Sequence, residues 1–288
     1  MVTIFTPTYN RAYILHQLYE SLCRQTCKEF EWLVVDDGSS DNTEELVRGF
    51  IEEHKITLRY YRQQNGGKHR AINKGVGLAR GELFFIVDSD DYLTDDAVEW
   101  VKSEYGNICE DSRFAGLSGC RQTPMGERIG GELPFERRDC NMLDLRMKYG
   151  VAGDMAEVYR TDVLRKFPFV EIEGEKFCPE ALVWNRIAQE YIMHWVNNGI
   201  YVCEYLPDGL TAHITRIRMK NPKTAKLYYS ELYNRDIPFL QKVKSAINFW
   251  RFALCADSTF VEDLGQIGVK ALLLFPFGWI MHLNDLRK

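Results

Sequence analysis

A run of five apolar residues that ends in three carboxylates is the stretch of this chain best suited to chemistry. Residues 83–87 are typical of a strand buried on both faces, and Asp88-Ser89-Asp90-Asp91 follows at once. Carboxylates this close raise one another's pKa unless a cation neutralises them, and their hard oxygens suit Mg²⁺ or Mn²⁺. The stretch predicts a divalent-cation site; a solvated turn with helix-capping aspartates is the alternative.

Two further polar clusters also follow apolar runs. Residues 2–5 form a short, mostly apolar run that ends in Thr6-Pro7-Thr8-Tyr9-Asn10. The apolar run 30–35 ends in Asp36-Asp37-Gly38-Ser39. Gly and Asp at these points predict tight turns directly after strands, where a carboxylate or an aromatic ring can contact a ligand.

Strands and helices alternate through about the first 90 residues, and this alternation predicts how the clusters meet. Apolar spacing predicts strands at 2–5, 30–35, 56–60 and 83–87, with helices at 12–25, 41–50 and 71–79 between them. Such an order indicates a doubly wound, mostly parallel sheet, in which ligands bind at the carboxyl ends of the strands. We therefore expect the three polar clusters to form one site.

Composition limits the class of protein. The 288 residues are 45% hydrophobic and 27% charged, with a net charge of −5, which argues against nonspecific binding of nucleic acid. The eight cysteines include no CxxC pair, so we expect free thiols. Residues 1–5 enter a strand directly, without a basic region and an apolar signal core, so we expect a cytoplasmic location.

The second half of the chain has less regular patterning. We expect a helix at 94–105, strands at 114–119 and 155–160, an accessory loop at 124–138, helices at 161–167 and 180–190, extended pieces within 192–205 around Asn197-Asn198-Gly199, and helices beyond Pro222.

The apolar segment 269–283 is too short to span a bilayer as a helix, and Pro276 and Gly278 interrupt it. Trp279 and flanking cations such as Lys270 fit peripheral contact with the inner face of the cell membrane. A helix packed on the core is the alternative.

Five motifs in this order resemble the glycosyltransferase family 2 domain of GT-A fold. They are Thr6-Pro7-Thr8-Tyr9-Asn10-Arg11, Gln25-Thr26, Asp36-Asp37-Gly38-Ser39-Ser40-Asp41, Asn73-Lys74-Gly75 and Asp88-Ser89-Asp90-Asp91. The later part of the chain also resembles non-processive bacterial members that build cell-surface polysaccharides, and the Gln-x-x-Arg-Trp motif of the processive synthases does not occur.

The resemblance implies a fold class and a division of the chain. The fold is α/β: a GT-A domain with a doubly wound, mostly parallel, Rossmann-like sheet, followed by a mainly helical carboxyl-terminal extension. Residues 1–220 form the glycosyltransferase domain, with 1–105 as the nucleotide-sugar-binding half and 106–220 as the acceptor-side half, and residues 221–288 form the extension.

The resemblance also implies roles for particular residues. The cation, Mn²⁺ or Mg²⁺, falls to Asp90 and Asp91, with His213 as a further candidate ligand. Contacts with the nucleotide-sugar donor, expected to be UDP-linked, fall to Thr6, Pro7, Tyr9, Asp37, Lys68, Asp88 and Ser89.

Inversion needs a base that removes the proton of the acceptor hydroxyl, and Glu180 lies in the segment where the family places it. Many members carry an adjacent Glu-Asp pair, whereas Ala181 follows here, and a helix-start glutamate is the alternative. Asp154 and Trp184 are expected on the acceptor side, although Trp184 also suits a core position.

These residues predict an inverting, metal-dependent transfer of one sugar to a saccharide or lipid-linked acceptor. A catalytically idle subunit that binds nucleotide sugars is the first alternative. A sugar nucleotidyltransferase is the second, although the chain lacks the Gly-rich, basic amino-terminal loop that such enzymes use on triphosphates.

Overall fold

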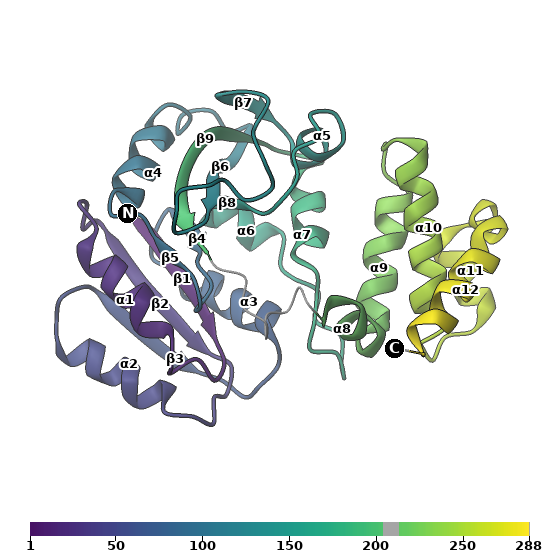
Figure 1. The fold of residues 1–288 in the computed structure, drawn as a ribbon, viewed down its shortest axis with the longest axis horizontal. Coiled ribbons are helices and arrows are strands. Elements are labelled where there is room, and N and C mark those ends of the chain that lie inside the picture. Colours follow the sequence, from purple (N-terminus) through teal and green to yellow (C-terminus); the bar gives the residue numbers. More distant parts are fainter. Residues whose placement is uncertain (204–212, 288) are drawn as a thin grey trace. The chain divides into compact units, whose positions relative to one another are not determined.

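The computed structural model describes residues 1–203 and 213–287, and the chain divides into two compact units (Figure 1). The first unit consists of Met1–Pro168 with Arg186–Tyr205, and the second of Phe169–Asn185 with Leu206–Lys288. We expected a single boundary near residue 220. Instead, residues 169–185 leave the first unit and group with the carboxyl-terminal helices.

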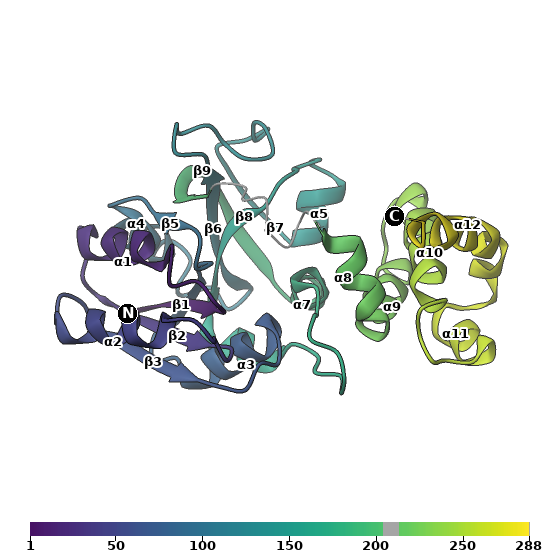
Figure 2. The same ribbon diagram turned by 60° about the horizontal axis from the view of Figure 1, so that its bottom comes forward.

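The first unit contains a mixed sheet with helices on both faces (Figures 1 and 2). Its strands are β1 (Val2–Thr8), β2 (Phe30–Asp36), β3 (Leu58–Arg62), β4 (Leu83–Ile86), β5 (Tyr92–Leu93), β6 (Phe114–Gln122), β7 (Arg137–Cys140), β8 (Met155–Arg160) and β9 (Ile192–Val202). Its helices are α1 (Leu15–Arg24), α2 (Thr43–Glu52), α3 (Lys68–Leu78), α4 (Ala97–Gly106), α5 (Met142–Met147) and α6 (Thr161–Lys166). Helix α7 (Glu180–Ile187) lies where the two units join along the chain.

The strand order explains how the polar clusters meet. Among the described residues the order is β3-β2-β1-β4-β8-β6-β9-β5, with β7 paired to β9. Strands β3, β2, β1 and β4 are parallel neighbours, so their carboxyl ends share one edge. Strand β8 is antiparallel to both β4 and β6, whereas β6 and β9 are parallel. The predicted doubly wound sheet is confirmed, and the antiparallel insertion of β8 lies beyond β4.

The apolar faces of the helices explain their positions. Apolar side chains of α1, α2 and α4, such as Leu18, Val47 and Val101, join one core cluster with Ile4 and Trp32 of the sheet. Helix α3 contacts β1 and β2 at the position of Phe5, on the opposite face. A Cβ at Gly75 would lie 2.1 Å from the Phe5 ring, so only glycine allows this close approach.

Several elements differ from the predictions. Helix α3 begins at Lys68, three residues before the expected start, and the short strands β5 and β7 were not predicted. Strand β9 is continuous from Ile192 to Val202, although Asn197-Asn198-Gly199 favoured separate pieces. The pairing of β6 with β9 instead shifts register near Gly199, so the turn-forming residues occupy a bulge.

The second unit is built from helices beyond residue 213. These are α8 (Ile214–Lys220), α9 (Pro222–Tyr233), α10 (Phe239–Ala253), α11 (Phe260–Ile267), the 3₁₀ helix η2 (Val269–Leu274) and α12 (Phe275–Asp285). Their core includes Tyr229, Phe249 and Trp250. Within the described residues no single helix is long and apolar enough to cross a membrane. The segments Phe260–Ile267 and Val269–Asp285 meet that test only as a pair, bent by 113°.

Candidate active site

Backbone and side-chain hydrogen bonds join the three polar clusters at the carboxyl edge of the sheet. The Asp37 N–H donates to the Thr8 carbonyl at 2.8 Å, and the Val87 N–H donates to the Phe5 carbonyl at 2.8 Å. The Asn10 N–H donates to the Ser39 hydroxyl at 2.9 Å. The predicted convergence of the clusters is therefore confirmed, because parallel strands β2, β1 and β4 end side by side.

The two carboxylates of the second cluster are occupied by the protein itself. Asp36 accepts the Ser39 N–H at 2.7 Å and the Tyr60 hydroxyl at 2.7 Å. The first bond closes the turn after β2, and the second ties that turn to β3. Asp36 therefore shapes the edge of the site from within the protein.

Asp37 holds the loop that precedes α3. One carboxylate oxygen accepts from the Gln63 side-chain amide at 2.8 Å and from the Gly66 N–H at 2.8 Å. The other accepts the Gly67 N–H at 2.7 Å. Gly67 has φ of +98°, a conformation that a side chain would strain. The resemblance gives Asp37 a contact with the donor, and in this structure its carboxylate fixes the loop that leads to Lys68.

Lys68 begins α3 and points its ammonium group at the third cluster. Its Nζ lies 2.6 Å from Asp88 Oδ1. Burial opposes ionisation of Asp88, but the charges of Lys68 and Arg121 outweigh it and lower the pKa of this carboxyl. Asp88 is therefore the member of the cluster that ionises most readily.

The other two carboxyls of the cluster are harder to ionise. Burial, and then the charge of Asp88, raise the pKa of Asp90. Burial and the charge of Asp88 raise the pKa of Asp91 to about 7. Arg11 opposes the shift of Asp90, since its Nη2 lies 3.7 Å from Asp90 Oδ2. The cluster thus holds more negative charge than its burial favours.

Two residues of the second half complete this network, and sequence reasoning missed both. Tyr201 on β9 accepts the Asp88 N–H at 2.9 Å and donates its hydroxyl to Asp91 Oδ2 at 2.7 Å. Arg121 on β6 lies 3.7 Å from Asp91 Oδ2, and its guanidinium carbon is 4.2 Å from the centroid of the Tyr201 ring. Arg121 could have been noticed in the sequence, because it is a charged residue that continues the apolar strand β6. The sequence around Tyr201 contains no comparable feature.

A second acidic pair lies beside Arg121. Glu157 of β8 is half-buried, and burial raises its pKa to about 7 although Arg121 and Arg146 oppose the shift. Asp154, expected on the acceptor side, is exposed just before β8, and its charge helps to raise the pKa of Arg121. Asp154 therefore belongs to the same electrostatic neighbourhood as the aspartates after β4.

The remaining donor candidates divide into surface and core positions. Tyr9 is 48% exposed at the edge, whereas Pro7 and Ser89 are buried. The Thr6 hydroxyl accepts the indole N–H of Trp32 at 2.9 Å inside the core, which gives it a structural partner. Thr8 was not predicted as a contact. Within the described residues its buried hydroxyl has no hydrogen-bond partner, which makes it a further candidate at this edge.

The carboxylates after β4 suit a cation that a substrate also helps to bind. Among the described residues, no group of three or more His, Cys, Asp and Glu side chains could hold a metal ion alone. Magnesium commonly uses one or two carboxylates together with substrate phosphates. Asp90 and Asp91 have the required hard oxygens, and their raised pKa values show that a nearby positive charge would be favourable.

Three predicted residues belong to the second unit. Glu180 is half-buried at the start of α7, as expected for either a base or a helix-start glutamate. Trp184 is buried and packs edge to face on Phe169 with ring centroids 5.7 Å apart, which favours the alternative of a core residue. His213 is exposed directly before α8.

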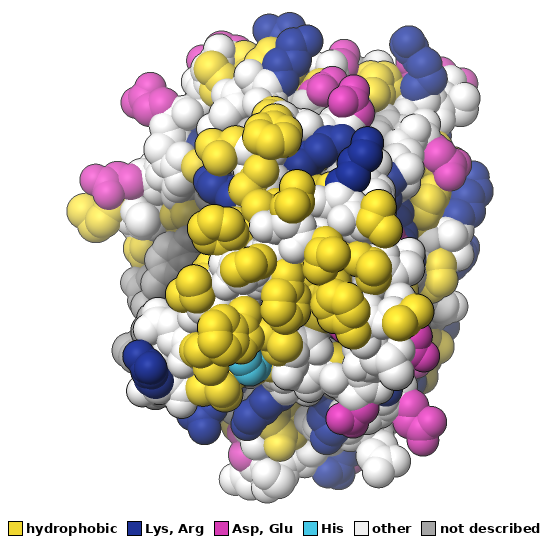
Figure 3. Space-filling model, turned by 90° about the vertical axis from the view of Figure 1, so that its right-hand side faces the viewer, with side chains coloured by type: hydrophobic (Ala, Val, Ile, Leu, Met, Phe, Trp, Pro, Cys, Tyr) yellow, Lys and Arg dark blue, Asp and Glu magenta, His cyan; other side chains and the backbone are white. Residues whose placement is uncertain are grey.

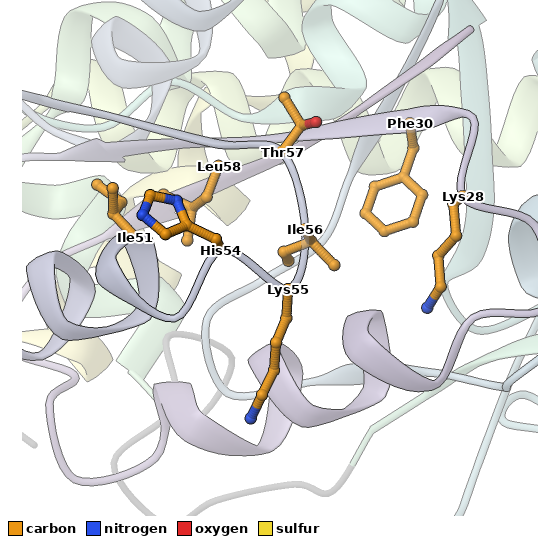
Figure 4. A pocket seen from close by; sticks show the side chains of 8 residues that line it. All are labelled: Lys28, Phe30, Ile51, His54, Lys55, Ile56, Thr57 and Leu58. Atoms are coloured by element: carbon orange, nitrogen blue, oxygen red, sulfur yellow. The ribbon is translucent and has the colours of Figure 1, made fainter.

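A separate cavity of about 460 Å³ lies at the other end of the strands (Figure 4). Phe30 and Leu58 in its wall are the first residues of β2 and β3, so it opens at their amino ends. The remaining lining residues are Lys28, Ile51, His54, Lys55, Ile56 and Thr57. This cavity is distinct from the aspartate cluster, which follows the carboxyl end of β4.

Comparison with known proteins agrees with this arrangement. Residues 3–111 match the family model described as glycosyl transferase family 2. The glycosyltransferase GlyG of Streptococcus pneumoniae is 32% identical over 99 residues, which cover 34% of this chain and 33% of GlyG. The chondroitin synthase of Escherichia coli is 35% identical over 105 residues, 36% of this chain and 15% of that protein. The matched part is therefore a third or less of the length of these relatives.

Solved structures share the fold over almost the whole chain. S. aureus TarS 1–349 in complex with UDP-GlcNAc matches with a TM-score of 0.65 and 17% identity, covering 99% of this chain and 89% of that one. The mannosyltransferase PcManGT of Pyrobaculum calidifontis, in complex with GDP-Man and Mn²⁺, matches with a TM-score of 0.57 and 18% identity, covering 98% and 80%. This chain therefore carries a family 2 glycosyltransferase domain of GT-A fold.

Proposed function

We propose that this chain is an inverting, metal-dependent glycosyltransferase. It moves one sugar from a nucleotide-diphosphate sugar, UDP-linked, to a saccharide or lipid-linked glycan acceptor in cell-surface polysaccharide biosynthesis. The observation that carries this proposal is the cluster Asp88, Asp90 and Asp91 at the carboxyl edge of a family 2 domain, with Lys68 2.6 Å from Asp88.

The site charges suit a donor that leaves as a diphosphate. A bound divalent cation on Asp90 and Asp91 would neutralise negative charge on the departing diphosphate. Lys68 can interact with the diphosphate as well as with Asp88, because its ammonium group has three N–H donors. Arg121, held over the Tyr201 ring, keeps further positive charge beside the same carboxylates.

The reaction also needs a proton acceptor, and we assign this role to Glu180. The acceptor hydroxyl oxygen forms a bond to the anomeric carbon while the bond from that carbon to the diphosphate oxygen breaks. The hydroxyl proton passes to the Glu180 carboxylate, and the nucleoside diphosphate leaves with the electron pair. Attack from the face opposite the leaving group inverts the anomeric configuration.

Relatives support the donor class and the type of product. A structural neighbour binds UDP-GlcNAc and another binds GDP-Man with Mn²⁺, which supports a nucleotide-sugar donor and a divalent cation. A relative named chondroitin synthase supports a saccharide acceptor. We further propose that the chain works in the cytoplasm, at the inner face of the cell membrane, where lipid-linked glycans are accessible.

Release of UDP from UDP-GlcNAc tests the proposal, measured with Mn²⁺, with Mg²⁺ and with EDTA. Asp90→Asn should remove the cation-stimulated turnover, and Glu180→Gln should lower turnover at least 100-fold while donor binding persists, since general-base catalysis contributes about 10²–10⁴-fold. Glu132→Gln, an exposed carboxylate outside the cluster, is the matched control. Unchanged turnover in Asp90→Asn would overturn the cation assignment.

Ligand-dependent stabilisation separates the alternatives. A ligand that binds only the native state raises the unfolding temperature, so a panel of UDP-sugars, GDP-Man and UTP identifies the donor class. Stabilisation by UDP-sugars without UDP release, for every acceptor tried, would identify an idle binding subunit. Stabilisation by UTP with release of pyrophosphate would identify a nucleotidyltransferase.

A further inference from the structure

A continuous apolar surface covers part of the helical unit. Figure 3 shows these side chains gathered into one patch, with Lys and Arg side chains near its border. We call this the α12 face and define it by the exposed large apolar residues of η2 and α12, together with Leu286 directly after α12. They are Val269, Leu272, Leu273, Phe277, Trp279, Ile280, Met281 and Leu286.

The same helices have a second, well-packed side. A Cβ on buried Gly278 would lie 2.5 Å from Trp250 Cβ, and buried Ala271 accepts the Trp250 indole N–H at 2.8 Å. These contacts fix η2 and α12 on α10. One side of the segment 269–283 therefore packs on the core of the helical unit, which is the alternative to membrane contact. Leu273, which is 82% exposed, lies on the other side.

The charges around the α12 face favour one kind of partner. Residues 264–284 contain no Asp or Glu, and Lys270 and Arg287 are exposed at either end. The two acids next to this stretch are hidden, because Asp263 pairs with Lys226 and Asp285 pairs with Arg251 inside the unit. Exposed Glu262, one position further away, caps the start of α11. The apolar face consequently presents positive charge and little negative charge.

The charge of the whole segment has the same sign. Residues 206–288 contain 12 lysines and arginines against seven aspartates and glutamates, a net charge of +5 in a chain whose total is −5. Residues 169–185 of the same unit add one lysine and four glutamates, so the whole unit has a net charge of +2. A second copy of this chain would bring the same cationic border against itself. An anionic lipid surface complements it, since basic residues near such a surface each contribute about 1 kcal/mol.

We propose that the α12 face docks on an anionic bilayer surface, with Phe277, Ile280 and Trp279 in the headgroup region and Lys270 and Arg287 on lipid phosphates. Tryptophan is enriched at membrane–water interfaces, where its ring lies at the level of the headgroups. This inference specifies the location given in the proposed function. Lipid binding can be measured without a sugar donor, so its failure is distinguishable from a failure of glycosyl transfer.

Vesicle sedimentation of the full chain tests the proposal. The wild type should bind vesicles of phosphatidylglycerol and phosphatidylcholine at low salt, and pure phosphatidylcholine much more weakly. The triple variant Leu273→Ser, Phe277→Ser, Ile280→Ser should bind about 100-fold more weakly, because it loses the buried apolar area. Lys270→Gln with Arg287→Gln should weaken binding about 30-fold on anionic vesicles only, at about 1 kcal/mol per charge.

Controls make the outcome decisive. Met125→Ser removes a side chain that is 86% exposed on the first unit and should leave lipid binding unchanged. All variants should keep the wild-type unfolding temperature and the wild-type rate of UDP release. Equal binding of the triple variant and the wild type would overturn the proposal. So would a concentration-dependent dimer that the triple variant abolishes, since it would assign the face to a second copy.

Discussion

Replacing Asp91 by asparagine should stabilise the fold at alkaline pH while it removes a cation ligand. Asp91 is buried beside Asp88, and its pKa is raised to about 7 by burial and by that neighbouring charge. In the unfolded chain the pKa returns to its ordinary value of 3.8. The native state therefore binds the proton more tightly than the unfolded state.

The sign of the pH dependence follows from linkage. Between about pH 4 and pH 7 the native chain carries a proton on Asp91 that the unfolded chain has lost, so the free energy of unfolding falls as pH rises through this window. The difference between about 7 and 3.8, at 1.36 kcal/mol per pH unit, sets an upper limit of about 4 kcal/mol. We expect the substitution to raise the free energy of unfolding by about 1–3 kcal/mol, because asparagine at position 91 also deprives Arg121 of a charged partner 3.7 Å away.

Urea unfolding in EDTA at pH 5 and pH 8 measures this effect. Asp91→Asn should be more stable than the wild type by about 1–3 kcal/mol at pH 8 and by much less at pH 5, since asparagine still accepts the Tyr201 hydroxyl. Adding Mn²⁺ with UDP should stabilise the wild type more than the variant.

Glu132→Gln is the control for the loss of an exposed carboxylate and should change neither difference. If Asp91→Asn is less stable than the wild type at pH 8, the carboxylate is favourably ionised in the native state. The reasoning from burial and from the charge of Asp88 would then be wrong.

Two further substitutions test the loop that borders the site and a buried ion pair at the opposite, amino end of β2. Asp37→Asn should raise the donor KM about 10-fold and speed the amide hydrogen exchange of residues 63–67. The reason is that the Gly67 N–H loses a charged acceptor worth about 1.5–3 kcal/mol. A changed preference among nucleotide bases with unchanged exchange would instead indicate that Asp37 contacts the base directly. Glu31→Ala should lower the free energy of unfolding by about 3–5 kcal/mol in urea at pH 7, because Arg59, 2.9 Å from the buried Glu31 carboxylate, keeps a largely buried charge. A loss below 1 kcal/mol would show that water replaces this pair at little cost.

Much of the site's framework was predictable because it is local. The apolar runs ending at Asp36 and Asp88 predicted strands, and parallel neighbours necessarily end at one edge. The free state of all eight cysteines is likewise confirmed. The roles assigned to Glu180, His213 and the individual aspartates remain predictions.

Other features depend on partners that spacing does not reveal. The Asp37 carboxylate could have faced a base or its own loop, and the positive φ of Gly67 brings backbone N–H groups to it. The Asn197-Asn198-Gly199 segment is typical of a turn in isolation. Pairing with β6 satisfies its backbone in a bulged strand instead.

By itself, the sequence determined an alternating α/β domain and three polar clusters at one edge of its sheet. Buried strands and tight turns depend mainly on residues that are neighbours in the chain, so a local pattern is enough to predict them. Only the tertiary structure decided what surrounds the carboxylates. Tyr201 reaches Asp88 across 113 positions in the chain, and Arg121 joins them from a strand that β8 separates from β4. The pKa shift of a buried carboxyl depends on such distant charges and hydrogen bonds, so it arises only once the chain has folded.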